Sequence, residues 1–222
     1  LSDQKLGNII LKGNFNENIQ ISVIDNRSKN FLEKNENFYK TWQDNYLTGC
    51  ITFLDSNFNG GTITIKNAKC EDAINIVRSK GYINEIDILN SSSDALDIDF
   101  SKIKINKMNI ENSGNDCSDF SYGNYQVKIA ILKNCGDKAI SVGEKSYFEI
   151  NQLNARNVSF GAVSKDSSKL FLNKGKVQDN SEFCLAAYNK KQEFDGGDIV
   201  YNEIFCDKEN FFNDNFSNIS KK

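Results

Sequence analysis

Three aspartates carry the residue types and the spacing that point most directly to chemistry. The chain repeats itself about every 22 residues, and aligning the repeats places Asp97 beside Asp119 on neighbouring strands. Strands lie about 4.8 Å apart, and carboxylates that close either share a proton, with one pKa raised, or bind a cation. Asp99 follows Asp97 by two positions. We therefore predict that Asp97, Asp99 and Asp119 share one outward face.

Two kinds of chemistry fit these aspartates, and their spacing does not choose between them. Three or four converging carboxylate oxygens are what Ca²⁺ requires. Retaining glycoside hydrolysis also uses two carboxyl groups, about 5 Å apart. The structural alternative is that exposed charges keep a sheet from aggregating.

Two lysines extend the same predicted face, because Lys138 and Lys165 fall in the next repeats. A lysine whose pKa is lowered by a nearby cation can accept a proton from a substrate. If the lysines instead pair with aspartates in a flat charged surface, binding without catalysis is favoured.

The elements that must position these side chains are short repeats. Aspartates open four of them at nearly equal intervals, and a series of asparagines keeps the same interval. The aspartates are Asp72, Asp94, Asp116 and Asp137, and the asparagines are Asn67, Asn90, Asn112, Asn134 and Asn157. Such a constant period indicates stacked coils. We interpret both series as structural, with the asparagines hydrogen bonding along the stack.

Each repeat contains stretches that alternate apolar and polar residues, which is typical of strands, and none has a helical apolar pattern. The sequence thus predicts an all-β parallel coil of about 22 residues per turn. The coils are 49–71, 72–93, 94–115, 116–136, 137–159, 160–182 and 183–205. The expected inward residues are Ile74, Ile76, Leu96, Ile98, Ser118, Phe120, Ile140, Val142, Ala162, Ser164, Leu185 and Ala187.

The regions outside these coils are less regular. We expect residues 1–48 to hold irregular coils or a cap, with strands near 8–11 and 19–24, and residues 206–222 to close the other end of the stack. An open stack end exposes apolar interior, so caps are expected. The chain begins with Leu1 rather than Met, which suggests a processed or truncated chain.

Composition limits the partners. The net charge of −3 argues against nucleic acid, which usually requires a basic face, and no run of about 18 apolar residues predicts a membrane span. Without histidine a zinc site is improbable. Cys184 and Cys206 are separated by one repeat length, so stacking would place them one coil apart, within disulfide reach. The alternative, which we favour, is that all six cysteines are buried thiols.

Together, the coil length, the asparagine series and the phrases at 93–99, 136–144 and 164–167 resemble right-handed parallel β-helix proteins of the pectate-lyase-like superfamily, in particular exported bacterial ones. The resemblance covers about residues 49–205. It implies a right-handed β-helix and an exported location, but that superfamily includes lyases, hydrolases, epimerases and non-catalytic surface proteins.

The resemblance also implies roles for residues. Lyases of this superfamily pair Ca²⁺ with a lysine or arginine base, which would assign Asp97, Asp99 and Asp119 to the metal and Lys138 or Lys165 to the base. No complete lyase motif is present, and the histidine of the related hydrolases is absent. Residues expected to contact substrate are Arg78, Tyr122, Tyr188 and Lys190.

Two functions follow as expectations. The first is action on an acidic polysaccharide by calcium-assisted lyase or epimerase chemistry. The second is a non-catalytic surface or adhesion module that binds a glycan, such as a cell-surface glycan, or a protein.

Overall fold

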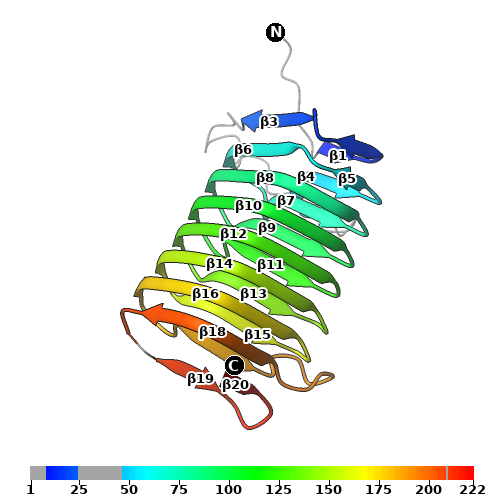
Figure 1. The fold of residues 1–222 in the computed structure, drawn as a ribbon. Helices are drawn as coiled ribbons and strands as arrows, with labels where there is room; N and C mark the ends of the chain where they lie inside the picture. The colour runs from blue at the N-terminus through cyan, green and yellow to red at the C-terminus, as the bar shows by residue number, and fades with distance from the viewer. Residues whose placement is uncertain (1–8, 25–46, 209) are drawn as a thin grey trace.

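The computed structural model describes residues 9–24, 47–208 and 210–222, and within them the fold is a parallel β-solenoid of about eight coils (Figure 1). The described residues form twenty strands and no helix, so the predicted all-β fold class is confirmed. No helical segment in the described part has the length and apolar character that a membrane crossing requires.

One sheet, called sheet A here, contains nine short parallel strands. In spatial order they are β1 (Ile9–Leu11), β4 (Gly49–Leu54), β7 (Asp72–Val77), β9 (Asp94–Asp99), β11 (Ser118–Ser121), β13 (Lys138–Gly143), β15 (Phe160–Lys165), β17 (Leu185–Tyr188) and β19 (Phe211–Asn213). Consecutive strands in this order come from consecutive coils, so the sheet runs along the whole stack (Figure 1).

The second sheet, sheet B, has eleven strands, most of them longer. They are β2 (Asn14–Asn16), β3 (Gln20–Ile24), β5 (Asn57–Asn59), β6 (Thr62–Ala68), β8 (Lys80–Ser91), β10 (Lys102–Ser113), β12 (Asn124–Cys135), β14 (Tyr147–Val158), β16 (Lys169–Asn180), β18 (Asp198–Cys206) and β20 (Asn218–Lys221). Each coil thus contributes strands to sheet A and then to sheet B.

The apolar core lies between the two sheets. All twelve residues predicted to point inward from the sheet A strands are fully buried. Phe120 packs against Tyr125 and Phe148 of sheet B, with ring centroids 5.1 Å and 4.6 Å apart. Burying this apolar surface is the main force holding the coils together.

The asparagine series forms the predicted ladder. Asn67, Asn90, Asn112, Asn134 and Asn157 all have positive φ, between 54° and 63°. From Asn90 onward, each Nδ2 donates to the Oδ1 of the asparagine one coil earlier, at 2.8–2.9 Å. Asparagine tolerates left-handed backbone and supplies both donor and acceptor, which explains its recurrence at this bend.

A second column of polar residues, which sequence analysis did not identify, lies where each coil leaves sheet A. The backbone N–H of Ser56 donates to Ser79 Oγ and that of Ser79 donates to Ser101 Oγ, both at 2.9 Å. These serines are buried. They satisfy backbone groups at a turn where the sheet ladder is interrupted.

The cysteines correct our favoured interpretation. Each of the six is in a disulfide, Cys50–Cys70, Cys117–Cys135 or Cys184–Cys206, so buried free thiols were the wrong prediction. The Cys184–Cys206 bond exists, but the reason given for it was also wrong. Cys206 pairs in register with Val177, and the bond joins the start and end of one coil rather than two coils.

That coil is longer than predicted. Tyr147 pairs with Lys169 one repeat later, but Lys169 pairs with Asp198, which lies well beyond the next repeat length. The additional residues form the loop 189–197 between β17 and β18. Sequence counting missed it because we continued the same repeat length into coil 183–205, and the 22-residue separation of Cys184 and Cys206 agreed with that length.

The stack continues at both ends of the predicted coils. Strands β1 and β3 lie at the expected positions near 8–11 and 19–24 and pair with β4 and β6, while β19 and β20 pair with β17 and β18. Residues 206–222, expected to close the stack, therefore add a further coil. Residues 25–46 of the expected N-terminal segment lie outside the described residues.

Candidate functional site

The outer face of sheet A carries the predicted columns in the predicted register. Asn75 pairs with Asp97, Asp97 with Asp119, Asp119 with Ser141, and Asp99 with Ser121. Asp97, Asp99 and Asp119 therefore lie on adjacent strands β9 and β11, all half-buried. We call this set, with Lys138, Glu144 and Lys165, the acid–lysine cluster.

Asp97 and Asp99 are two neighbouring carboxyl groups of the cluster, and both lie beside Asn75. Asn75 Nδ2 donates to Asp97 Oδ2 at 3.2 Å and lies 3.5 Å from Asp99 Oδ2. Burial, and then the neighbouring carboxyls of Asp72, Asp99 and Asp119, raise the pKa of Asp97 well above its usual value. Burial also raises the pKa of Asp99 to about 6. Both shifts favour the protonated form of these carboxyl groups, which can donate a hydrogen bond.

Asp119 has a different environment, although it lies directly beside Asp97. Lys165 Nζ is 3.4 Å from Asp119 Oδ2, and the backbone N–H of Phe120 donates to Asp119 Oδ1 at 2.9 Å. A carboxyl whose pKa is raised therefore adjoins one that is paired with a cation. Pairs of titratable groups held in unlike environments are typical of acid–base sites.

The two lysines predicted as bases are both buried and paired. Lys165 is only 3% exposed, and Lys138 lies 3.4 Å from Asp116 Oδ1 while also pairing with Asp137. Burial alone would lower the pKa of each lysine, but the carboxylates outweigh it and the pKa of both is raised. A raised pKa leaves little neutral amine, so catalysis by either lysine would require a ligand that alters these pairs.

A glycine makes room for Lys165. A Cβ added at Gly143, in the strand beneath, would lie 2.7 Å from Lys165 Cε. The lysine stem therefore passes over Gly143 to reach Asp119, two coils away. This close approach explains why glycine occupies position 143, at the end of β13.

Glu144 connects the cluster to the 189–197 loop. Lys191 Nζ lies 2.5 Å from Glu144 Oε1, and Ser121 Oγ donates to Glu144 Oε2 at 2.5 Å. Burial alone would raise the pKa of Glu144, but the hydrogen bonds from Lys191 and Ser121 outweigh burial and lower this pKa. Buried Asp166 holds the same loop, because its Oδ1 accepts the backbone N–H groups of Lys190 and Lys191 at 2.7 Å and 2.8 Å.

Beside the cluster lies a pair of exposed aromatic rings. Phe100 and Tyr122 follow Asp99 and Ser121, are 57% and 42% exposed, and stack with centroids 4.7 Å apart and planes 6° from parallel. Phe194 of the loop meets Tyr122 edge-on at 6.3 Å, and Lys145 Nζ lies 5.6 Å from the Phe194 ring centroid. We call Phe100, Tyr122 and Phe194 the aromatic ledge.

The four residues predicted to contact substrate do not all lie at the cluster and the ledge. Tyr122 lies in the ledge, and Tyr188 is half-buried near the lysines, where burial raises its pKa. Arg78 pairs with Asp55, with Nε–Oδ1 at 2.8 Å. Lys190 contributes a backbone contact to Asp166, whereas its neighbour Lys191 makes the ion pair. The roles assigned to these residues stay predictions.

Sequence reasoning assigned no role to Phe100 or Asn75. Phe100 had a usable signal, because it aligns with Tyr122 one repeat later at the same turn. The contact of Lys191 with Glu144 was not predicted, since it depends on the inserted loop.

The structure contains some, but not all, of the oxygen ligands that a calcium site requires. Asp97, Asp99 and the buried Oδ1 of Asn75, which has no hydrogen-bond partner, are the all-oxygen donors that Ca²⁺ prefers. No three acidic, cysteine or histidine side chains in the described residues are arranged to hold a metal ion. Asp119 would have to leave Lys165 to join the other two.

Comparison with protein-family models, with curated proteins and with solved structures found no match for this chain. The solenoid is consistent with a β-helix, but no comparison supports the pectate-lyase-like superfamily in particular.

Proposed function

We propose that the protein is a glycan-binding β-solenoid whose ligand lies on the outer face of sheet A, against the aromatic ledge and the acid–lysine cluster. The single observation that carries the proposal is the exposed, stacked Phe100–Tyr122 pair beside carboxyl and ammonium groups. A pyranose has an apolar ring face and polar hydroxyl edges, so it matches a flat aromatic surface flanked by hydrogen-bonding groups.

The stacked pair also has a structural interpretation, because stacking joins two coils. Aromatic pairs contribute about 0.5–1.5 kcal/mol beyond their buried area. Both rings, however, leave around half of their surface in solvent, which a purely structural pair would bury. An exposed apolar patch rimmed by polar groups is more typical of a binding site.

Pairing of the lysines favours binding over catalysis. Lys138, Lys165 and Lys191 each contact a carboxylate, which is the arrangement we associate with a non-catalytic module. Of these three lysines, Lys191 has the most exposed side chain, at 43%, so it is the cation that a ligand can reach. Exchange of its Glu144 partner for a uronate carboxylate would select acidic glycans.

Three disulfides support export as part of this proposal, because disulfides persist in oxidising compartments and are rare in the cytosol.

The test is a screen of immobilised neutral and acidic glycans, followed by titration of any glycan that binds. We expect Phe100→Ala/Tyr122→Ala to weaken binding about tenfold or more, as loss of central aromatic contacts commonly does. Phe205→Ala is the matched control, because Phe205 is 55% exposed on sheet B. Equal loss in the control, or full binding by the double variant, would exclude the ledge.

Calcium-assisted lyase or epimerase chemistry is the second candidate, favoured by the unpartnered Asn75 Oδ1 beside Asp97 and Asp99. When bound, Ca²⁺ would neutralise a uronate carboxylate and make the adjacent C–H more acidic. Asp97, Asp99 and Asp119 would hold the ion, and Lys165 would lie nearest to receive a proton.

Calorimetric titration of Ca²⁺ into chelator-treated protein tests this candidate. We expect micromolar binding in the wild type and none in Asp97→Ala/Asp119→Ala. Absence of heat in the wild type would eliminate the calcium mechanism and leave the binding proposal intact.

A further inference from the structure

The candidate site lies on sheet A. The outer face of the other sheet, sheet B, contains two shallow hollows that share lining residues. One, of about 300 Å³, is lined by Lys104, Asn106, Gln126 and Lys128, and the other, of about 280 Å³, by Phe171, Asn173, Asn202 and Lys222. Glu149 and Asn151 line both. We call the joined hollows the amide trough.

The trough runs across the strands and therefore along the stack. Apart from Lys222, which follows β20, its residues come from β10, β12, β14, β16 and β18, which are successive neighbours in sheet B. Four strand spacings of about 4.8 Å give a length of roughly 19 Å. An extended polymer of several units fits this length, whereas a compact small molecule would occupy only part of it.

Side-chain amides line the floor of the trough. Asn173 Nδ2 donates to Asn151 Oδ1 at 2.7 Å, and Asn202 Nδ2 donates to Asn173 Oδ1 at 2.8 Å. This is a second asparagine ladder, and each amide has a further N–H that the ladder does not use. Repeated donors at the coil spacing suit a polymer that repeats oxygen acceptors at a similar interval.

The charge of the trough is positive. Lys104, Lys128 and Lys222 are exposed, and none has an ion pair within the part of the chain that the structure describes. The single acid, Glu149, already accepts hydrogen bonds from Gln126 Nε2 at 2.9 Å and Tyr147 Oη at 2.7 Å. An anionic ligand is therefore favoured.

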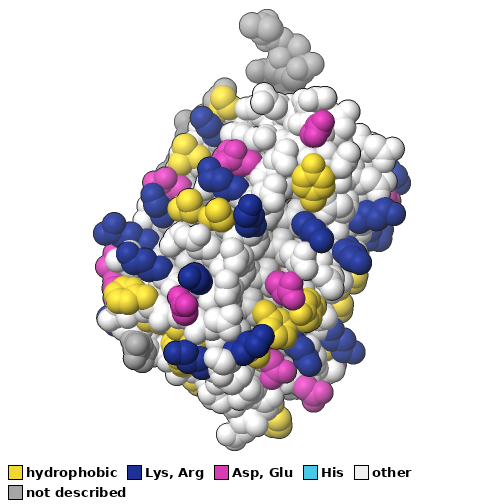
Figure 2. Space-filling view, viewed as in Figure 1, with side chains coloured by type: hydrophobic (Ala, Val, Ile, Leu, Met, Phe, Trp, Pro, Cys, Tyr) yellow, Lys and Arg dark blue, Asp and Glu magenta, His cyan; other side chains and the backbone are white. Residues whose placement is uncertain are grey.

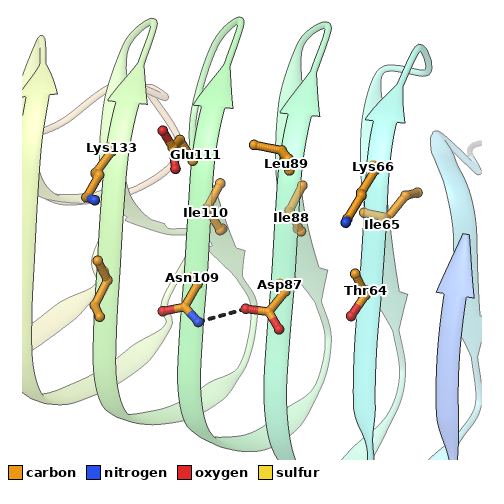
Figure 3. A pocket seen from close by; sticks show the side chains of 11 residues that line it. Thr64, Ile65, Lys66, Asp87, Ile88, Leu89, Asn109, Ile110, Glu111 and Lys133 are labelled. Carbon is orange, nitrogen blue, oxygen red and sulfur yellow. Dashed lines mark hydrogen bonds between the residues drawn. The ribbon is translucent and has the colours of Figure 1, made fainter. Parts of the chain in front are cut away.

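Another hollow on the same sheet provides a contrast. It measures about 400 Å³, and its charged residues are balanced, because its lining includes Lys66 and Lys133 as well as Asp87 and Glu111 (Figure 3). Asp87 is already engaged by Asn109 Nδ2 at 2.7 Å (Figure 3). On the visible side of the molecule, basic and acidic side chains are likewise interspersed along the stack (Figure 2). The lining of this hollow thus differs from that of the trough, which contains three lysines and one acid.

We propose that the amide trough is a second binding site, which takes an extended acidic oligosaccharide along the axis of the solenoid. Lysines Lys104 and Lys128 hold its carboxylates, and the Asn151–Asn173–Asn202 ladder donates to its hydroxyl and ring oxygens. A nucleic acid is less suited, because single strands favour successive aromatic platforms in a continuously basic channel, and amides fill the middle of this trough.

The test uses Phe100→Ala/Tyr122→Ala as the parent protein, so that the ledge on sheet A does not contribute. Into this parent and its Lys104→Gln/Lys128→Gln derivative we would titrate an oligogalacturonate, its neutral methyl ester and an oligothymidylate. The matched control is Lys66→Gln/Lys133→Gln, which removes the same charge from the balanced hollow.

We expect the oligogalacturonate to bind the parent, and the trough variant to lose about tenfold or more in affinity, as expected for lost charge-assisted contacts of over 1.4 kcal/mol. The control should retain the parent affinity.

Equal loss in both lysine variants would mean non-specific attraction and would overturn the site. Equal binding of the methyl ester, or tighter binding of oligothymidylate, would overturn the assignment to an acidic glycan. Asn173→Leu, which interrupts the ladder without changing charge, should also weaken binding. Because the ledge is absent throughout, these outcomes do not depend on the proposed function.

Discussion

At the scale of single residues, the unusual feature is the number of carboxyl groups that the fold holds out of water. Asp72 is 3% exposed, and burial raises its pKa to about 8, with Thr48 Oγ1 donating a hydrogen bond to it. Burial likewise raises the pKa of Asp116 to about 6. Such groups cost folding free energy when they ionise.

These shifts predict that the protein is more stable in mild acid. Between about pH 4 and pH 8 the folded protein keeps protons that the unfolded chain has released, so the free energy of unfolding falls as pH rises. Each buried carboxyl contributes its full stabilisation below the pKa that it has in the unfolded chain. This contribution is lost as the pH rises through the pKa of the folded state. We expect a higher midpoint of thermal unfolding at pH 5 than at pH 8, measured by circular dichroism.

Asp72→Asn tests which residue is responsible. It should raise the unfolding midpoint at pH 8 by an amount corresponding to a few kcal/mol, since each pKa unit is worth about 1.4 kcal/mol. Below pH 4 the two proteins should be alike, because both then carry a neutral side chain. A wild-type profile that rises with pH would contradict the prediction.

At the scale of elements, the asparagine ladder determines how each coil bends. Asn112 is central, since it donates to Asn90 and accepts from Asn134, both at 2.8 Å, with φ of 63°. Asn112→Ala loses two hydrogen bonds and places alanine in left-handed backbone. We expect it to cost about 2–4 kcal/mol in urea unfolding.

Asn112→Gly separates the two causes. Glycine has no steric penalty at positive φ, so this variant should recover about 1 kcal/mol relative to alanine. If both variants are equally unstable, hydrogen bonding alone accounts for the ladder. If neither is destabilised, the ladder does not hold the coils in register.

The disulfides act on the same scale, because each closes one coil. Cys117 and Cys135 have Cα atoms 5.3 Å apart and are 18 residues apart in the chain. We expect Cys117→Ala/Cys135→Ala to lose about 2–4 kcal/mol of unfolding free energy in non-reducing buffer. Adding a reductant should destabilise the wild type and leave this variant less affected. An unchanged wild type under reduction, with reduction verified by thiol titration, would contradict a stabilising role.

At the scale of the whole molecule, the solenoid is nearly one-dimensional, because the strands of each coil pair only with those of the adjacent coils. Stability should then be highest in the middle and decline towards the described ends. We predict slowest amide hydrogen exchange in β10, β12 and β14, and faster exchange in β1, β19 and β20, measured by mass spectrometry. Uniform protection along the stack would indicate a single cooperative unit instead.

The sequence by itself predicted the repeat, and with it most of the backbone. A constant period fixes which residues stack, so the pairing of Asp97 with Asp119 and the buried inward positions followed from alignment alone. The asparagine ladder was predictable for the same reason. A repeat transmits register from coil to coil, because strand pairing alternates strictly between faces.

The tertiary structure alone decided what breaks the repeat. The 189–197 loop, which brings Lys191 to Glu144 and Phe194 to Tyr122, depends on an insertion that spacing concealed. The disulfides, the reach of Lys165 past Gly143 to Asp119 and the raised carboxyl pKa values depend on side-chain direction and burial. Periodicity specifies which backbone positions are neighbours, whereas the paths of side chains and the exclusion of water are set only when all coils are packed together.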